Sequence, residues 1–586
     1  MACLIIDTVQ LGELHGEHHG TYKLGRWDWI SRGYTPAGVE AWNAIRGIDL
    51  LESWPGIDGS RIGITGRSGG GAYSWYTAAL DERIKVAVPV AGITDLHNHV
   101  IDGCVTGHCD CMYMINYYGW DYPKLAALIA PRPLLLANSD TDGIFPLDGV
   151  MRTHRQLKNL YAKLGASGHY GVIITPGPHK DTQELQVGAF RWLLRTLLGE
   201  ETIISDAALK ELEPAALAVF ERETPADERV AAVGSWFVPS TVTVPHEQQA
   251  AKLFKEHWFP ELRHTALSLP ITALAETPQF EVTSLRQTTS DNDPRRVKLH
   301  QTTPADGHAI SILEIDASPA HRQSGSSEPS VAMVHLGELD DLAADTESLS
   351  GFSNSPRAVA MLAEQPSAKH YFIRTRNANW QQADLTVKQK TQIVRRFYLL
   401  GQMPEQRELA DVLSSLQWIN RLVSSGDAQP VAVTLTGAHR SAAIATLAGL
   451  VCAANLSPEL PSVAELRVSH YPSDPELAPT LPGLLRVCDY ASLLAAARGS
   501  FPVAETNESS DGAHATQRLV DSSSEPQQAC GFKIVEVGQD SARVWVRATR
   551  WALPNLGDLP AVRFASPGAK SKQSTGPILP ATGVEG

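Results

Sequence analysis

The sequence predicts an α/β protein built on a mostly parallel sheet with helices on both faces. Short apolar runs rich in Val, Ile and Leu alternate with helix-compatible stretches over residues 1–200. These runs lack polar alternation, as expected of strands buried on both faces. The same alternation returns between about 306 and 500, so we expect a second α/β domain after the first.

The elements of the first domain follow from this pattern in chain order. We expect strands at Ala2–Ile6, Arg61–Thr65, Ile84–Val90, Pro133–Ala137 and Gly171–Thr175, and helices at Pro36–Glu52, Gly70–Leu80, Val150–Leu164 and Thr182–Leu198. The first strand has no lead-in and resembles a buried strand. We therefore expect the sheet to be incomplete at its N-terminal side, with the chain starting inside a domain.

The remaining chain divides into four further regions. Residues 201–305 predict a helical connecting region, and 501–530 are polar and turn-rich, as expected of a disordered linker. Residues 531–586 alternate apolar and polar positions around "GQDS" before a tail, which predicts a partial β-sandwich. The second domain, 306–500, has predicted strands at Ala309–Ile315, Ser330–His335, His370–Thr375, Pro430–Thr436 and Ala464–Ser469.

Composition excludes some classes of function. The net charge is −14, and no block of Lys or Arg appears, so we expect no nucleic-acid partner. No apolar run has the length of a membrane span. The N-terminus lacks the basic and apolar segments of a signal peptide. The oligomeric state does not follow from the sequence.

The stretch "RIGITGRSGGGAYSWYTAAL" (61–80) combines an apolar strand, a glycine-rich turn and a helix. Gly66, Ser68 and Gly70 form a G-x-S-x-G pattern in the strand–turn–helix context of a nucleophile elbow. The alternative is a purely structural role, in which Ser68 only caps the N-terminus of the helix. The backbone N–H of Gly69 would supply one oxyanion donor.

Two later loops favour the nucleophile over the cap. An acid and a histidine should follow the serine, each just past a strand. Asp140 and Asp142 follow the apolar strand of "PRPLLLANSDTDGIFPLDGV", and His179 lies in a Gly/Pro loop after the next strand. Asp142 is assigned as the acid because it lies four residues before Pro146, while Asp140 suits the turn. His179 would take the serine proton, and Asp142 would orient the imidazole.

Longer stretches carry a family resemblance. "DTVQLGE", "SRGYTPAGVEAWNAIRGIDLL", "AVPVAGITDL" and the elbow and acid loops resemble α/β-hydrolases of the bacterial acetyl xylan esterase type, with looser similarity to cephalosporin-C deacetylases and glucuronoyl esterases. The resemblance covers about residues 1–200. It implies a three-layer α/β-hydrolase fold, a Ser68–Asp142–His179 triad, no cofactor, and an extracellular or periplasmic location.

The implied activity is that of a serine esterase that deacetylates acetylated xylan, a similar polysaccharide or another small ester. Glucuronoyl esterases typically carry arginine directly after the nucleophile, whereas here Arg67 precedes Ser68. A prolyl-oligopeptidase-type hydrolase and an inactive carbohydrate-binding or scaffold protein are the alternatives. The fold's second oxyanion donor, from a loop near the start of the sheet, is expected to be missing. Arg67, Trp27, Trp29 and Tyr34 are candidates for substrate contact, although such aromatics are more often core residues.

A short loop concentrates cysteine and histidine. "HNHVIDGCVTGHCDCMYM" contains Cys104, Cys109 and Cys111 together with several histidines. A zinc site, a disulfide-stapled insertion and buried thiols are all compatible with these residue types. The spacing matches no recognised zinc motif, so we assign no metal.

The second domain repeats the first without its chemistry. "PVAVTLTGAHRSAAIATLAGL" aligns with the elbow when Gly437 is matched to Gly66, which puts His439 at the nucleophile position and Ser441 at the last glycine. No later pair of an aspartate and a histidine, each just past a strand, follows. We therefore expect a degenerate α/β-hydrolase-like copy. The tail at 531–551 resembles the β-sandwich that precedes the catalytic domain of alkaline phosphatase D-type proteins, without a phosphatase motif.

Overall fold

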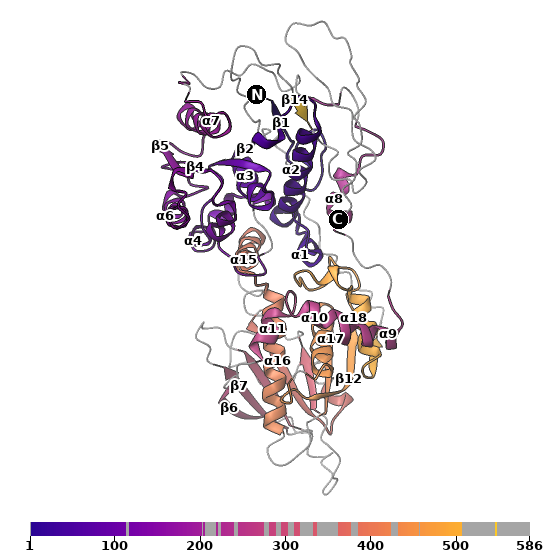
Figure 1. Cartoon of the computed structure of the whole chain (residues 1–586). Coiled ribbons are helices and arrows are strands. Elements are labelled where there is room, and N and C mark those ends of the chain that lie inside the picture. The colour runs from indigo at the N-terminus through magenta and orange to yellow at the C-terminus, as the bar shows by residue number, and fades with distance from the viewer. Residues whose placement is uncertain are drawn as a thin grey trace.

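The computed structural model describes residues 2–112, 116–201, 203–204, 218–220, 224–238, 244–274, 280–288, 295–302, 310–316, 332–336, 361–376, 385–423, 432–455, 457–506 and 545–547. These residues form two α/β lobes, one N-terminal and one from the later part of the chain (Figure 1). Within these ranges, no helix combines the length and apolar character needed to cross a membrane.

The N-terminal lobe contains a parallel sheet with strand order β2-β3-β4-β5. Its strands are β2 (Ile62–Arg67), β3 (Ile84–Val90), β4 (Leu134–Ser139) and β5 (Tyr170–Thr175). Its longer helices are α2 (Pro36–Ser53), α3 (Gly69–Leu80), α6 (Leu147–Lys163) and α7 (Gln183–Leu198), with short helices α1 (Asp28–Arg32), α4 (Leu96–Val100) and α5 (Tyr122–Ala126).

Alternation along β4 assigns these helices to the two faces of the sheet. Leu134 and Leu136 pack in one core cluster with residues of α2, α3 and α6. Leu135 packs in another with Leu185 and Ala189 of α7. Because successive strand residues point to opposite faces, the sheet lies between two helical layers. The predicted three-layer arrangement is confirmed for this lobe.

The second lobe contains a sheet with strand order β13-β12-β11-β9-β10-β8-β7-β6. Its strands are β6 (Phe280–Thr288), β7 (Arg295–Thr302), β8 (Ser311–Ile315), β9 (Ala332–Leu336), β10 (Lys369–Arg374), β11 (Ala432–Ala438), β12 (Ser462–Ser469) and β13 (Val503–Thr506). Strands β9 to β13 pair in parallel, whereas β6, β7 and β8 pair antiparallel and β8 also runs antiparallel to β10. The helices that follow α7 along the chain are α8 (Val233–Trp236), α9 (Glu247–Leu253), α10 (Phe259–Leu262), α11 (Ser268–Ala273), α15 (Val387–Leu399), α16 (Pro404–Val423), α17 (Arg440–Ala453) and α18 (Tyr490–Arg498). Of these, α8 packs on the N-terminal lobe.

Several predicted boundaries are wrong. The predicted connecting region contains β6 and β7, so this sheet begins at Phe280. The predicted linker contains β13 in its first residues, and the rest of it, 507–530, lies outside the described residues. The predicted β-sandwich also lies almost wholly outside them. Of the tail, β14 (Trp545–Arg547) pairs in parallel with β1 (Cys3–Ile5), whose residues are exposed or half-buried rather than buried.

The turn between β11 and α17 has the same backbone geometry as the turn between β2 and α3. His439 has φ 51° and ψ −128°, and Ser68 has φ 59° and ψ −118°. Each residue donates its N–H to the carbonyl of the last residue of the neighbouring strand: His439 to Ser469 at 3.0 Å, and Ser68 to Val90 at 3.0 Å. This agreement supports the expectation of a second hydrolase-like copy, which stays a prediction.

Helix α15 joins the two lobes and lies beside α4 in Figure 1. Its Tyr398 and Leu399 belong to the core of the N-terminal lobe. The Leu399 carbonyl accepts a hydrogen bond from Asn116 Nδ2 at 2.8 Å. Part of the N-terminal core is therefore completed by a helix that lies more than two hundred residues further along the chain.

Candidate active site

Ser68 lies between β2 and α3 in a left-handed backbone conformation. A non-glycine residue there is strained by about 1–3 kcal/mol and persists only where its surroundings hold it. The surroundings are glycines: a Cβ on Gly66 would lie 2.6 Å from the Gly70 carbonyl carbon, and one on Gly71 would lie 2.5 Å from the Val90 oxygen. The glycines let strand and helix approach closely enough to impose the turn.

The loops after β4 and β5 bring Asp142 and His179 together. His179 Nδ1 lies 2.8 Å from Asp142 Oδ2. The other oxygen, Oδ1, accepts the N–H groups of Ile144 at 2.8 Å and Phe145 at 2.9 Å. Because the carboxylate only accepts, Nδ1 carries the hydrogen and Nε2 of a neutral ring carries the lone pair.

Asp140 has a different task. Its Oδ1 accepts the N–H of Gly177 at 2.9 Å, and its own N–H bonds to the Thr175 carbonyl at 2.9 Å. The side chain is exposed and fixes the turn that leads to His179. Of the two predicted acids, Asp142 is therefore the one in contact with the histidine.

Gly69 is the first residue of α3, directly after Ser68. The first N–H groups of a helix have no partner within the helix and favour negative charge. A Cβ placed on Gly69 would lie 3.7 Å from Met112 Cε and 3.9 Å from Cys111 Sγ. The cysteine-rich loop therefore lies beside the start of the elbow helix.

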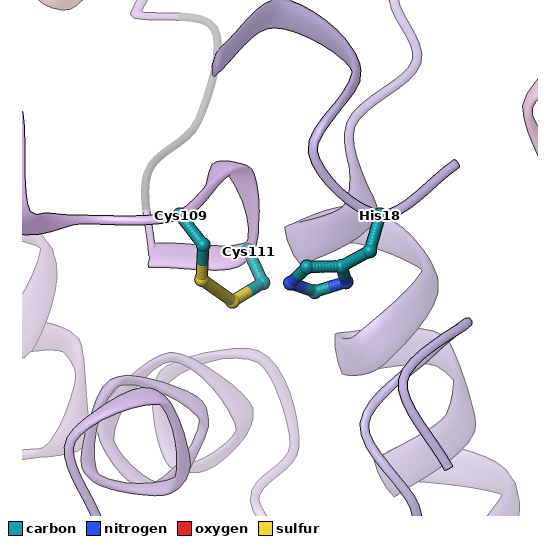
Figure 2. Close-up of side chains that lie close together, drawn as sticks. All are labelled: His18, Cys109 and Cys111. Atoms are coloured by element: carbon teal, nitrogen blue, oxygen red, sulfur yellow. A yellow bond between two sulfur atoms is a disulfide. The ribbon is translucent and has the colours of Figure 1, made fainter. Parts of the chain in front are cut away.

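That loop carries a disulfide between Cys109 and Cys111. Figure 2 shows the edge of the His18 ring facing the two sulfur atoms. His18 Nδ1 lies 2.8 Å from the Val9 carbonyl, and the buried Nε2 has no hydrogen-bond partner. Of the predicted alternatives, the disulfide holds for this pair, whereas Cys104 is a free, buried thiol.

Cys104 belongs to a second cluster in the same loop. Its Sγ and one ring nitrogen each of His99 and His108 lie within 4.8 Å of one another, and all three residues are buried. Burial lowers the pKa of His99 to about 4 and that of His108 well below its usual range. Burial also raises the pKa of the Cys104 thiol to about 12. At neutral pH both rings and the thiol are therefore uncharged.

Two of the four candidates for substrate contact lie in the core of the N-terminal lobe. Trp29 and Tyr34 are each 1 % exposed, and their rings pack edge to face with centroids 4.8 Å apart. They belong to a core cluster with Val233 of α8, so the expectation that they stack on a sugar is wrong. Trp27 is half-buried against the main core, and Arg67 is the half-buried last residue of β2.

Two buried ionisable groups were not predicted from the sequence. Burial raises the pKa of Glu40, on α2, to about 8, although the carboxylate accepts the Val9 N–H at 3.0 Å. The fully buried Arg395 of α15 donates to the carbonyls of Val105 at 3.0 Å and His108 at 2.6 Å. A glutamate and an arginine within amphipathic helices carry no local signal of burial, because the partners come from distant segments.

Comparisons with known proteins find one matching family and several similar proteins. Residues 19–177 match the prolyl oligopeptidase family. The N-terminal lobe has the α/β-hydrolase fold. A putative hydrolase, YtaP, of Bacillus subtilis is 30% identical over 161 residues, which are 27% of this chain and 54% of the relative. The chain therefore spans about half the length of that curated relative.

The similar solved structures include several glucuronoyl esterases. A catalytic domain from Hypocrea jecorina is 24% identical, with a TM-score of 0.25 over 29% of this chain and 54% of that one. A carbohydrate esterase family 15 glucuronoyl esterase from Caldicellulosiruptor kristjansonii is 20% identical, with a TM-score of 0.25 over 36% of this chain and 58% of that one.

Proposed function

We propose that the N-terminal lobe is a serine hydrolase of carboxylic esters, with Ser68 as nucleophile, His179 as general base and Asp142 as the orienting acid. The observation that carries the proposal is the hydrogen bond between Asp142 and His179, made by loops that follow neighbouring strands of the sheet whose β2 leads into Ser68. Within the described residues Ser68 Oγ makes no hydrogen bond to the imidazole. Such contacts are often long before substrate binds.

The reaction follows from the tautomer. His179 Nε2 accepts the Ser68 proton while Oγ forms a bond to the ester carbonyl carbon. The carbonyl oxygen becomes an oxyanion, for which the Gly69 N–H is a donor worth about 3 kcal/mol. The imidazolium, stabilised by Asp142, then protonates the leaving alcohol as its C–O bond breaks. Water, deprotonated by His179, hydrolyses the acyl-enzyme and restores Ser68.

For the substrate, we propose an acetyl ester on xylan or a similar polysaccharide. The support is the resemblance of the elbow and acid-loop motifs to acetyl xylan esterases. Glucuronoyl esters are the alternative, since proteins of that name are among the similar structures. Against them stands the order Arg67-Ser68-Gly69, in which the arginine precedes the nucleophile. Peptide bonds after proline are the third class, because of the matched family.

The test is hydrolysis of p-nitrophenyl acetate by the full chain and by Ser68→Ala. The matched control is Ser60→Ala, which changes an exposed serine just before β2, at the opposite end of that strand from the elbow. We expect hydrolysis in the control and background rates in Ser68→Ala. Acetylated xylan, a methyl glucuronate ester and a prolyl peptide amide then separate the three substrate classes. Equal background rates from all three folded proteins would contradict the esterase and favour a binding or scaffold role.

A further inference from the structure

In the cysteine-rich loop, the buried rings of His99 and His108 each direct an unprotonated nitrogen toward the other ring. His99 Nδ1 lies 2.8 Å from the Asp95 carbonyl oxygen, and His108 Nε2 lies 2.8 Å from the Ile144 carbonyl oxygen. A carbonyl only accepts, so each of these nitrogens carries the one hydrogen of a neutral ring. The remaining nitrogens, His99 Nε2 and His108 Nδ1, lie 3.2 Å apart with no hydrogen between them.

The thiol of Cys104 lies beside these two ring nitrogens. Cys104 is free and buried, and its Sγ lies within 4.8 Å of a ring nitrogen of each histidine. Two imidazole nitrogens and a sulfur are ligands that zinc prefers. In a tetrahedral zinc site with Zn–N bonds of 2.0–2.1 Å, two nitrogens lie about 3.3 Å apart. The observed separation of the two nitrogens fits that geometry.

We propose that His99, Cys104 and His108 form a binding site for one zinc ion. On binding, the Cys104 S–H bond breaks, the proton passes to solvent, and the thiolate and the two ring lone pairs become ligands. The fourth tetrahedral position is left to a solvent molecule. The Asp95 and Ile144 carbonyls are the outer partners that fix the tautomer and orientation of each ring, as ligating histidines require.

The surrounding charges tolerate the cation. A fully buried positive group beside this loop is Arg395, whose guanidinium holds the loop through the Val105 and His108 carbonyls. Its charge is opposed by Asp110, with Nη2 3.7 Å from Oδ1. The site is therefore not flanked by an uncompensated positive charge.

The site is connected to the proposed catalytic acid. His108 holds the carbonyl of Ile144, and the N–H of the same Ile144 donates to Asp142 Oδ1. The Phe145 ring stacks on His108 with centroids 4.7 Å apart, and it also stacks with the His179 ring at 5.9 Å. An ion that fixes the His108 ring would fix the turn that presents Asp142.

The neighbouring cluster of His18, Cys109 and Cys111 is a separate matter. Its two sulfurs are bonded to each other, so they offer no thiolate (Figure 2). It serves as the control for the location of the metal.

The experiment measures metal per chain by mass spectrometry in the full-length protein, purified without chelator and dialysed against Zn²⁺ and then against metal-free buffer. We expect about one zinc in the wild type and none in Cys104→Ser. The matched control is Cys452→Ser, which changes another free, buried thiol, in α17, and should keep the zinc. The double variant Cys109→Ser/Cys111→Ser should keep it too. Circular dichroism establishes that each variant is folded.

A second measurement reports the ligands directly in the wild type. Cobalt(II) bound in place of zinc should give a sulfur-to-cobalt charge-transfer band, lost in Cys104→Ser and kept in Cys452→Ser. The proposal is overturned if the wild type binds no zinc, if Cys104→Ser binds as much as the wild type, or if only the double variant loses it. Copper retained in preference to zinc would overturn the choice of ion. None of these readouts requires esterase activity.

Discussion

Replacing Asp142 by Asn tests the proposed triad most directly. The Asn side-chain oxygen can still accept the Ile144 and Phe145 N–H groups that now bond to Oδ1. Its NH₂ group then faces His179 Nδ1, where a carboxylate oxygen now lies at 2.8 Å. Nδ1 must become an acceptor, which moves the ring hydrogen to Nε2 and removes the base.

The expected loss follows from that change of tautomer. A wrong tautomer in a Ser-His-Asp triad lowers kcat about 10⁴-fold, or about 5.5 kcal/mol of transition-state stabilisation. The assay is steady-state hydrolysis of p-nitrophenyl acetate, with KM expected to change only a few-fold and the melting temperature only slightly. Asp140→Asn is the matched control and should lose less than about tenfold in kcat, since Asp140 bonds only to backbone groups. If Asp142→Asn kept a tenth of the activity, or Asp140→Asn fell as far, the reasoning would be refuted.

Three further predictions concern stability, measured by urea unfolding of the full chain. Gly92→Ala should lower the free energy of unfolding by more than about 2 kcal/mol, because the new Cβ would lie 2.2 Å from a backbone carbon. At Gly143 a new Cβ would have nothing within 4 Å, so Gly143→Ala should change it by less than about 0.5 kcal/mol. Glu40 has a folded pKa of about 8 against an unfolded value of 4.5, so the folded state holds its proton more tightly and stability is lost as pH rises between those values. The loss is about 2.5 kcal/mol from pH 5 to 7, and Glu40→Gln should abolish it; an unchanged pH profile would contradict this. Arg395→Met should cost about 3 kcal/mol, because two loop carbonyls lose a buried charged donor; a loss below about 1 kcal/mol would show that α15 does not hold the loop.

Local chemistry explains what could be predicted from the sequence. The elbow is a contiguous strand–turn–helix whose glycines are visible as letters, and the acid and histidine each follow an apolar strand. Asp142 was distinguished from Asp140 by its position relative to Pro146, and it is Asp142 that contacts His179. Strand β3 has the predicted bounds because it is apolar and buried throughout most of its length.

The failures come from contacts between distant segments. Strand β6 is rich in polar residues and pairs antiparallel with β7, so neither has the apolar signature of the parallel strands. Strand β13 is short and lies at the sheet edge. Trp29 and Tyr34 are buried partly by α8, about two hundred residues away in sequence, which no local pattern around them reveals. The His99–His108 pair likewise requires the carbonyl of Ile144 from another loop.

At Ser68 a strained backbone turn and a nucleophilic hydroxyl occur together, whereas at His439 only the turn is present. Its φ of 51° lies in the same left-handed region, although histidine offers no hydroxyl there. The bend therefore follows from the close connection between a parallel strand and the helix after it, and it forms whether or not the site carries out a reaction. Chemistry on this architecture begins with an exposed backbone position already present, and only three side chains, the serine, the proton acceptor and its carboxylate, have to be acquired. By this logic a lobe of this kind lies only a few side chains away from reactivity, without any rearrangement of its backbone.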